Sequence, residues 1–356
     1  MNDILPFLKS LLNAPGLSGY EDPASDLIAD RWVPLVQKIS RGRLGSLHGF
    51  RPGSGDDPRP SVMIATHMDA IGLMVTGIQD EFLRITQIGG VDPRVLPGTL
   101  VTVYGTSTGK RSIPGVVAVP PARLLPQEIG LNPVPLEYLF VDTGLSARKL
   151  ANLVNIGDIV AFAQAPLELT GETIAGHSLD NRASVAALTV CLEELQSRSQ
   201  IWDVWAVATA QEEIGSSGAI SSAFALRPTI AVVVDVTWAK GPGAGDWRTS
   251  PLGHGPTLCM GPNIHPALHQ AMQGLAEKLE IPFGVEYAPR HTGTDGYATQ
   301  VVAEGIPTLV MGIPLRYMHT PVEVVALKDI QRAGRLMAEF ITGLQPDFMK
   351  KITWDD

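Results

Sequence analysis

The second half of the chain alternates strand-like and helix-like segments. Short apolar runs at 203–209, 229–235 and 308–312 have the length and composition of buried strands. Residues 180–196, 267–279 and 327–344 carry apolar side chains at helical spacing. Strands that alternate with helices are typical of a mostly parallel sheet with helices on both faces. We therefore predict an α/β fold for this part of the chain.

The first 70 residues add two helices and a strand. Apolar residues at helical spacing predict a helix over 3–13, which Pro15 and Gly16 end. Ser18 and Glu21 have the spacing of a capping box, in which Ser18 caps a second helix over 21–34 and Glu21 reaches back. The apolar run at 61–66 predicts a buried strand.

Residues 73–169 have a different pattern. Short β-like runs alternate with turn signals, and helical periodicity is confined to a short stretch near 147–153. This pattern is typical of a small all-β barrel or sandwich. We therefore predict that residues 1–72 and 170–356 form one discontinuous α/β domain, into which a small β-barrel domain of residues 73–169 is inserted.

Composition and charge narrow the classes of partner. The 356 residues are 45% hydrophobic and 18% charged, which favours a large folded core over disorder. The net charge of −9 and the lack of a dense Lys/Arg block argue against nucleic acid. No run of about twenty apolar residues is present, so we expect no membrane span. The apolar contexts of Cys191 and Cys259, and Asp3 where a signal peptide needs positive charge, favour a cytoplasmic location.

Five polar clusters follow buried-looking strands or open a helix. They centre on His67 with Asp69, Asp180, Glu212 with Glu213, Asp235 and His319. In open parallel sheets, functional side chains gather at the carboxyl ends of the strands, so residues far apart in sequence can converge there. Each cluster alone has an ordinary structural interpretation, such as a helix cap for Asp180. Their joint occurrence favours a common site.

These residue types suit a metal site. Imidazole and carboxylate ligands together bind zinc, cobalt or manganese, and a carboxylate shared by two ions lets the pair activate one water molecule. Asp69, two residues after His67, can hydrogen-bond its imidazole. Of the adjacent Glu212 and Glu213, one can bind metal while the other takes a proton from the water. We therefore predict a hydrolase with two divalent metal ions per subunit, zinc being the first expectation.

The ordered set of motifs resembles the tetrahedral, glutamyl-type aminopeptidases, a group of di-metal peptidases that includes members labelled endoglucanase. The resemblance covers nearly the whole chain and is specific as a set, although each match alone is weak. Beside Asp235, the matching segments are APGLSGYED at 14–22, HMDAIG at 67–72, DNR at 180–182, EEIG at 212–215, GTD at 293–295 and IPLRYMHTP at 313–321.

The resemblance implies a role for each predicted ligand. Asp180 would bridge the two ions. His67 and Asp235 would complete one metal site, and Glu213 and His319 would complete the other.

The resemblance also implies roles around the metals. Glu212 would be the general base and later the proton donor to the leaving amine, and Asp69 would orient His67. Asp295 would lie near the site, with a turn carboxylate as an equal alternative. The implied fold is a phosphorylase/hydrolase-like α/β domain with an inserted barrel that helps dimers form. The implied assembly is a homo-oligomer, up to a dodecamer.

Two positions depart from the family pattern. Ala70 stands where the family usually has Glu, and Asn181 stands where it usually has Asp. Neither is a metal ligand in that pattern, but loss of two charges near the ligands can change metal affinity or choice.

The favoured hypothesis is an aminopeptidase that acts on short peptides. The alternatives are a di-metal acylase or deacetylase, a glycosidase that needs no metal, and a non-catalytic, metal-stabilised shell protein. The preference for the first residue of the substrate stays open. Arg290, Arg316 and Lys240 are the candidates for an acid-binding pocket, with solvated loop charges as the ordinary interpretation.

Overall fold

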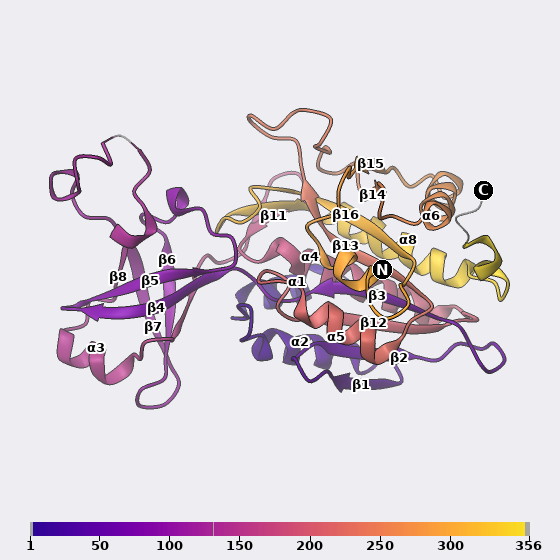
Figure 1. Cartoon of the computed structure of the whole chain (residues 1–356), viewed down its shortest axis with the longest axis horizontal. Coiled ribbons are helices and arrows are strands. Elements are labelled where there is room, and N and C mark those ends of the chain that lie inside the picture. The colour runs from indigo at the N-terminus through magenta and orange to yellow at the C-terminus, as the bar shows by residue number, and fades with distance from the viewer. Residues whose placement is uncertain (1–2, 131, 353–356) are drawn as a thin grey trace.

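The computed structural model describes residues 3–130 and 132–352, which fold into a large α/β lobe and a smaller β lobe (Figure 1). The helices are α1 (Leu5–Asn13), α2 (Asp22–Trp32), α3 (Ala147–Leu153), α4 (Leu179–Glu194), α5 (Ser217–Leu226), α6 (Pro266–Lys278), α7 (Asp295–Gln300) and α8 (Leu327–Gly343). None of these described helices is long and apolar enough to cross a membrane.

The large lobe is built on one mixed sheet. Its strands are β1 (Lys38–Arg41), β2 (Leu47–Arg51), β3 (Ser61–His67), β10 (Leu167–Leu169), β11 (Thr173–Gly176), β12 (Asp203–Thr209), β13 (Ile230–Trp238), β14 (Thr257–Met260), β15 (Gly284–Tyr287), β16 (Thr308–Arg316) and β17 (Glu323–Ala326). The order is β1-β2-β12-β3-β13-β16-β17-β11-β10, with β14 paired to β16 and β15.

Parallel pairing is concentrated in the centre of this sheet. Strands β12, β3, β13 and β16 run parallel to one another, whereas the strands that flank them on both sides pair antiparallel. The central strands are buried along almost their whole length, as parallel strands covered on both faces must be. The expectation of a mostly parallel sheet therefore holds for the four central strands and is wrong for the flanks.

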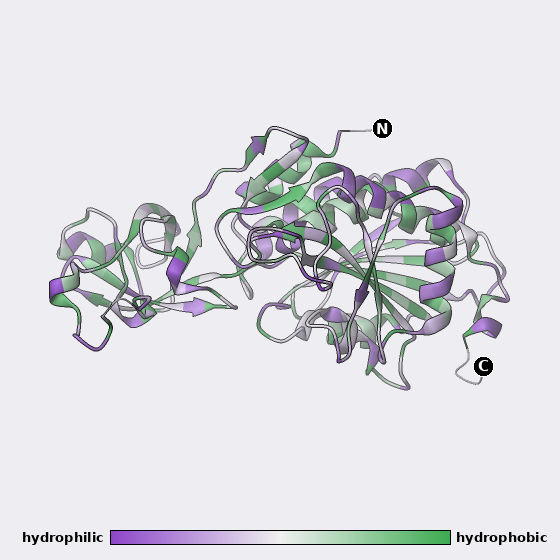
Figure 2. Cartoon of the chain, turned by 90° about the horizontal axis from the view of Figure 1, so that it is seen from above, coloured by the Kyte–Doolittle hydropathy of each residue, from purple (hydrophilic) through white to green (hydrophobic). Residues whose placement is uncertain are grey.

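Helices surround these apolar strands, which fan through the middle of the large lobe in Figure 2. Helix α4 is buried on nearly all sides from Leu179 to Leu192, and it packs against α8, α1, β3 and β13. A helix that is buried on all sides is an interior helix, and α4 buries polar side chains at its N-terminal end as well as apolar ones. Its N-terminus therefore lies inside the lobe, directly above the sheet.

The small lobe is a closed barrel, as the sequence predicted. Its strands are β4 (Gly72–Gln79), β5 (Phe82–Ile88), β6 (Leu100–Gly105), β7 (Arg111–Ala118), β8 (Phe140–Asp142) and β9 (Ile159–Phe162), closed in the order β4-β5-β8-β7-β6-β9. All of its pairs are antiparallel, and buried side chains alternate with exposed ones, as along β6. The domain bounds at 72/73 and 169/170 stay a prediction, and β10 pairs with β11 in the large sheet.

The predicted capping box at the start of α2 is wrong. Helix α2 begins after Glu21 without a side-chain cap, and the Ser18 hydroxyl donates instead to the carboxylate of Asp69. Glu21 does bond the Gly19 N–H, but it also accepts from the N–H of Gln211. Tertiary partners have therefore replaced the local cap that the spacing suggested.

Candidate metal centre

The parallel strands bring the predicted ligands to one edge of the sheet. His67 is the last residue of β3 and pairs in register with Thr209, the last residue of β12. Asp235 lies in the neighbouring β13. The three side-by-side strands run in the same direction. β3 and β12 end here and β13 continues to Trp238, so Asp235 and the residues that follow β3 and β12 meet at this edge.

The other ligands come from connections at the same edge. Glu213 lies in the turn between β12 and α5, His319 follows β16, and Asp180 lies at the start of α4. Ser178, Gln211 and His319 itself adopt left-handed backbone conformations although none is glycine. Such conformations are uncommon and gather at functional sites.

The five side chains form two groups that share one carboxylate. In the first, His67 Nε2 lies 3.1 Å from Asp180 Oδ1 and 3.6 Å from Asp235 Oδ1. In the second, His319 Nε2 lies 3.4 Å from Asp180 Oδ2 and 3.5 Å from Glu213 Oε2. Within each group the potential ligand atoms lie within 4.8 Å of one another. Asp180 thus offers one oxygen to each group.

This donor set fits divalent cations. Four carboxylates and two imidazoles converge here. The fourth carboxylate belongs to Glu212, which lies beside the five predicted ligands with its Oε2 3.9 Å from His67 Nε2. No Lys or Arg of the described residues pairs with any of these carboxylates. Buried like charges need a compensating charge, and the shared Asp180 places the two groups next to each other. Two divalent ions would supply that charge.

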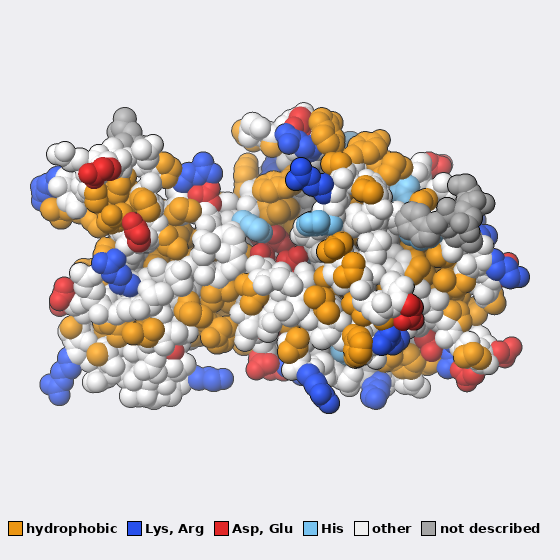
Figure 3. Space-filling view, in the orientation of Figure 1, with side chains coloured by type: hydrophobic (Ala, Val, Ile, Leu, Met, Phe, Trp, Pro, Cys, Tyr) orange, Lys and Arg blue, Asp and Glu red, His pale blue; other side chains and the backbone are white. Residues whose placement is uncertain are grey.

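The groups open into a cleft of about 400 Å³. Its wall includes Val236, Met318, Thr294 and Gly293 of the large lobe and Gly90, which follows barrel strand β5. Figure 3 shows acidic and histidine side chains gathered in a hollow of the large lobe, near the barrel. A substrate in the cleft would therefore touch the predicted ligands, Glu212 and an edge of the barrel lobe.

Burial and mutual repulsion perturb the titration of these groups. Burial raises the pKa of Glu212 to about 9 and that of Glu213 to about 10, and nearby carboxylates add to both shifts. Burial also raises the pKa of Asp235. For Asp180, hydrogen bonds from the two histidines outweigh the effect of burial and lower its pKa. Such opposed shifts within one cleft are typical of functional sites.

Asp69 contacts two parts of the site. Its Oδ1 lies 3.6 Å from His67 Nδ1, whereas its backbone oxygen lies closer to that atom, at 3.2 Å. Its carboxylate accepts hydrogen bonds from the N–H groups of Glu212 and Glu213 and from the Ser18 hydroxyl, at 3.0, 3.2 and 2.6 Å. The carboxylate therefore binds the turn that carries the glutamates more directly than it binds the histidine.

Glu323 is a residue of the site that the sequence analysis missed. It is fully buried at the start of β17, where Oε2 accepts the N–H of Asp180 and Oε1 accepts the N–H of His319, both at 3.0 Å. Burial raises its pKa well above the usual range. A glutamate that directly precedes the apolar run Val324–Ala326, four residues after His319, was the available signal.

The two departures from the family pattern are accommodated locally. Asn181 Nδ2 donates to the carbonyl of Val234 at 2.9 Å, which an ionised aspartate could not do, while its Oδ1 has no partner among the described residues. Ala70 is buried, and its backbone pairs with Gly16 and Ser18. Both positions therefore support the backbone beside the ligands.

Asp295 lies near the site without belonging to either group of ligands. It is buried at the start of α7, where its Oδ2 accepts from the Thr209 hydroxyl at the end of β12. Burial raises its pKa to about 6. It is therefore a buried carboxylate beneath the site rather than an exposed turn carboxylate.

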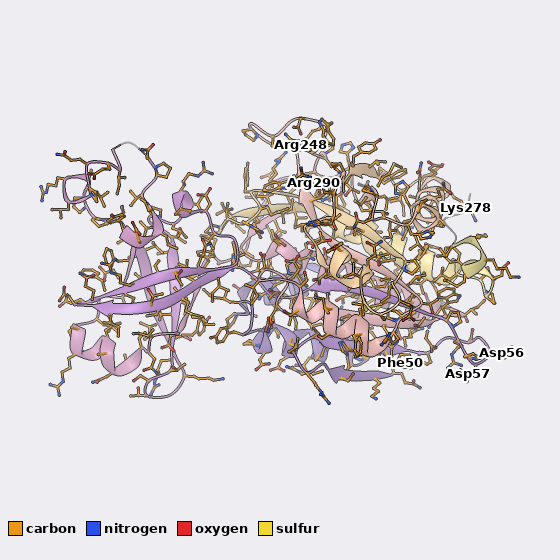
Figure 4. The ribbon with its side chains drawn as sticks, viewed as in Figure 1. Phe50, Asp56, Asp57, Arg248, Lys278 and Arg290 are labelled. Atoms are coloured by element: carbon orange, nitrogen blue, oxygen red, sulfur yellow. The ribbon has the colours of Figure 1, made fainter. Side chains whose placement is uncertain are left out.

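The three basic candidates do not line the cleft. Arg316, the last residue of β16, donates through Nε to the carbonyl of the exposed Lys240, which follows β13. Arg290, labelled in Figure 4, is exposed at the upper side of the large lobe. The described cleft wall thus contains no arginine or lysine that would favour an acidic first residue.

Comparison with known proteins identifies the family. A model of the M42 glutamyl aminopeptidases matches residues 45–336. The chain is 36% identical to the lysyl aminopeptidase of Pyrococcus furiosus, over 95% of this chain and 97% of that protein. It is also similar to the aminopeptidase APDkam598 of Desulfurococcus kamchatkensis, with 33% identity, a TM-score of 0.90, and 98% and 97% of the two chains covered.

An assembled relative has the same fold. The TET1 peptidase of Pyrococcus horikoshii, which can form a tetrahedron or a large octahedral shell, is 28% identical with a TM-score of 0.83, over 96% of this chain and all of that one. Together with the site described above, these matches show that the chain belongs to the M42 glutamyl aminopeptidase family and is a hydrolase of the aminopeptidase class.

Proposed function

We propose that this aminopeptidase removes N-terminal residues from short peptides with two divalent metal ions. His67, Asp180 and Asp235 would hold one ion, and Asp180, Glu213 and His319 the other. The observation that carries this proposal is the position of Asp180, whose Oδ1 faces His67 in one group and whose Oδ2 faces His319 in the other. When bound, two such ions lower the pKa of a water molecule and polarise the carbonyl that it attacks.

Glu212 is the proposed general base. It lines the cleft beside both groups but belongs to neither. The positive charge of two bound ions would lower its raised pKa, so that its carboxylate could take a proton. It takes that proton from the attacking water and later passes it to the leaving amine. Asp69 and Glu323 do not touch substrate in this scheme, because both are buried behind the ligands and bond their backbone.

The substrate's free amine would lie beside the acidic side of the cleft. The lining carboxylates attract an ammonium group, and no described basic side chain in the wall competes for them. Zinc is the proposed metal, with cobalt and manganese as alternatives that share its ligands. The proposed location is the cytoplasm, and the proposed fold class of the large lobe is phosphorylase/hydrolase-like.

The proposed assembly is a homo-oligomer in which the barrel contributes to dimer contacts. It rests on similarity to TET1 peptidases, one of which is described as a dodecamer. Twelve copies are therefore the proposed state of this chain as well.

Replacing Glu212 by Gln tests the proposed base. The amide keeps the size of the side chain but cannot take a proton, so kcat should fall about 100-fold or more while both ions stay bound. Metal content by elemental analysis and turnover of an aminoacyl chromogenic substrate give the two readouts. A Glu212→Gln enzyme that turns over at near wild-type rate would show that another group is the base.

A further inference from the structure

The N-terminal segment Gly16–Glu21 runs beside the end of β3. Ala70 donates its N–H to the carbonyl of Gly16 at 3.0 Å, and Ser18 donates its N–H to the carbonyl of Ala70 at 3.3 Å. Arg182, buried on α4, anchors the same segment by donating through Nη2 to the carbonyl of Gly16 at 3.4 Å. The segment is therefore fixed to α4 and to the connection that follows β3, although it belongs to no helix or long strand.

Two side chains of this segment hold the turn that carries the glutamates. The buried Ser18 hydroxyl donates to Asp69 Oδ2, and the Asp69 carboxylate accepts the N–H groups of Glu212 and Glu213. Glu21 Oε1 accepts the N–H of Gln211 at 3.1 Å. Three consecutive amides, 211 to 213, are thus bound by two carboxylates that the N-terminal segment supplies or orients.

This turn needs outside support. Gln211 has a φ of 60°, a left-handed conformation that a residue with a Cβ adopts at a cost in energy. The turn follows the last residue of β12 and precedes α5, so neither element fixes the direction of its side chains. Small shifts of the turn would move the Glu213 carboxylate away from Asp180 and His319. A metal site tolerates only small errors in the position of a ligand.

We propose that Ser18 and Glu21 are positioning residues that set the geometry of Glu213 and Glu212 from outside the cleft. Neither residue lines the cleft, so each acts through the turn. The inference rests on the proposed metal sites. It adds an asymmetry between them, because the turn supplies a ligand to the Glu213–His319 group and none to the His67–Asp235 group.

Titration of metal-free Ser18→Ala protein with zinc tests this asymmetry. The lost hydroxyl leaves Asp69 Oδ2 with a single partner, so the carboxylate can rotate away from the turn. Loss of a group that bonds a metal ligand directly usually weakens binding by about 10-fold to 100-fold. Ser18 acts one step further out, through Asp69, so one of the two binding events should weaken by about 10-fold while the other changes less than about twofold. kcat should fall with little change in KM.

Ser25→Ala is the matched control. Ser25 lies on α2, is equally buried, and its hydroxyl has no hydrogen-bond partner among the described residues. The control removes the same atom from a neighbouring position without releasing the turn. Both of its binding events should match those of the wild type.

Glu21 provides a second test that does not depend on Ser18. A single oxygen, Oε1, accepts both the Gly19 and the Gln211 N–H, so Gln can retain both bonds and Ala can retain neither. Glu21→Ala should therefore weaken the binding of one ion selectively, as Ser18→Ala does. Glu21→Gln should bind both ions as the wild type does. Thermal unfolding of each metal-free variant separates this effect from a loss of folding.

Two outcomes overturn the inference. In the first, Ser18→Ala and Glu21→Ala bind both ions as tightly as the wild type. In the second, both ions weaken equally and in proportion to lost thermal stability, which would mark the segment as structural support only. These readouts do not use peptide hydrolysis. A wild-type protein that binds two ions but cleaves no peptide would refute the proposed function and leave this inference testable.

Discussion

Glu323 bonds the backbone of two proposed metal ligands with its two oxygens, one to Asp180 and one to His319. Sequence reasoning predicted the five residues that the structure brings together because each follows an apolar strand or opens a helix. It missed Glu323 and misassigned Ser18, because their functions depend on partners that lie far away in the chain. Ser18 bonds a residue 51 positions later, and Glu323 bonds one 143 positions earlier. Local spacing carries no information on such contacts.

Replacing Glu323 by Gln should be damaging, in contrast to the same change at Glu21. Glu323 accepts an N–H with each oxygen, and these two bonds favour the ionised carboxylate against the raising effect of burial, so the amide of Gln would face one buried N–H with another donor. An unpaired buried group costs about 1–3 kcal/mol. Thermal unfolding and zinc titration should show lower stability and weaker binding of both ions, since Asp180 is shared. Unchanged affinity for both ions would show that Glu323 does not support the ligands.

At the scale of elements, the central strands were predictable and the periphery was not. The strand at 203–209 was predicted at its observed bounds because its apolar run is strong, and the possible short helical stretch near 147–153 is helix α3. Helix α5 was missed, since its small residues have little helical periodicity, and β1 and β2 were missed because they are short and partly polar. The antiparallel flanks depend on long-range pairing that no local pattern reports.

The loop after β5 brings the barrel against the site at Gly90. A Cβ added there would lie 3.0 Å from His319 Nδ1, so Gly90→Ala should displace the most exposed of the five proposed ligands. Zinc affinity of one site should fall, measured by titration. Gly77→Ala in the same lobe is the control, because its nearest atom would be 3.7 Å away. Wild-type zinc affinity in Gly90→Ala would mean that the loop after β5 moves aside without displacing His319.

His48 ties β2 to α5 through a 2.9 Å hydrogen bond between its Nε2 and the Ser222 hydroxyl. Burial lowers its pKa below the usual 6.5, so the folded protein favours the neutral imidazole. The unfolded chain then binds the proton first, and the free energy of unfolding should fall as the pH drops below 6.5.

The slope from this one group is at most about 1.4 kcal/mol per pH unit. Denaturant unfolding of metal-free protein at a series of pH values measures it, and His48→Gln should flatten the curve. An equal slope in both proteins would assign the pH dependence to other groups.

At the scale of the whole molecule, the two lobes contribute different parts of the proposed site. The large lobe supplies all five proposed ligands from one edge of its sheet, and among the described residues the barrel supplies only Gly90 to the wall of the cleft. The sequence predicted this two-lobe plan from the change of pattern near residues 73 and 170. It could not predict how the barrel meets the site, because that contact depends on the arrangement of the lobes.

The central claim is that the protein is an aminopeptidase that needs two bound metal ions and a substrate with a free amine. Metal-free enzyme titrated with zinc, and assayed on one aminoacyl chromogenic substrate and its N-acetylated counterpart, tests it most directly. Activity on the free-amine substrate should rise until two equivalents are bound, because both groups must be filled, and the acetylated substrate should stay uncleaved. Full activity without metal or with one equivalent, or equal cleavage of the acetylated substrate, would contradict the claim.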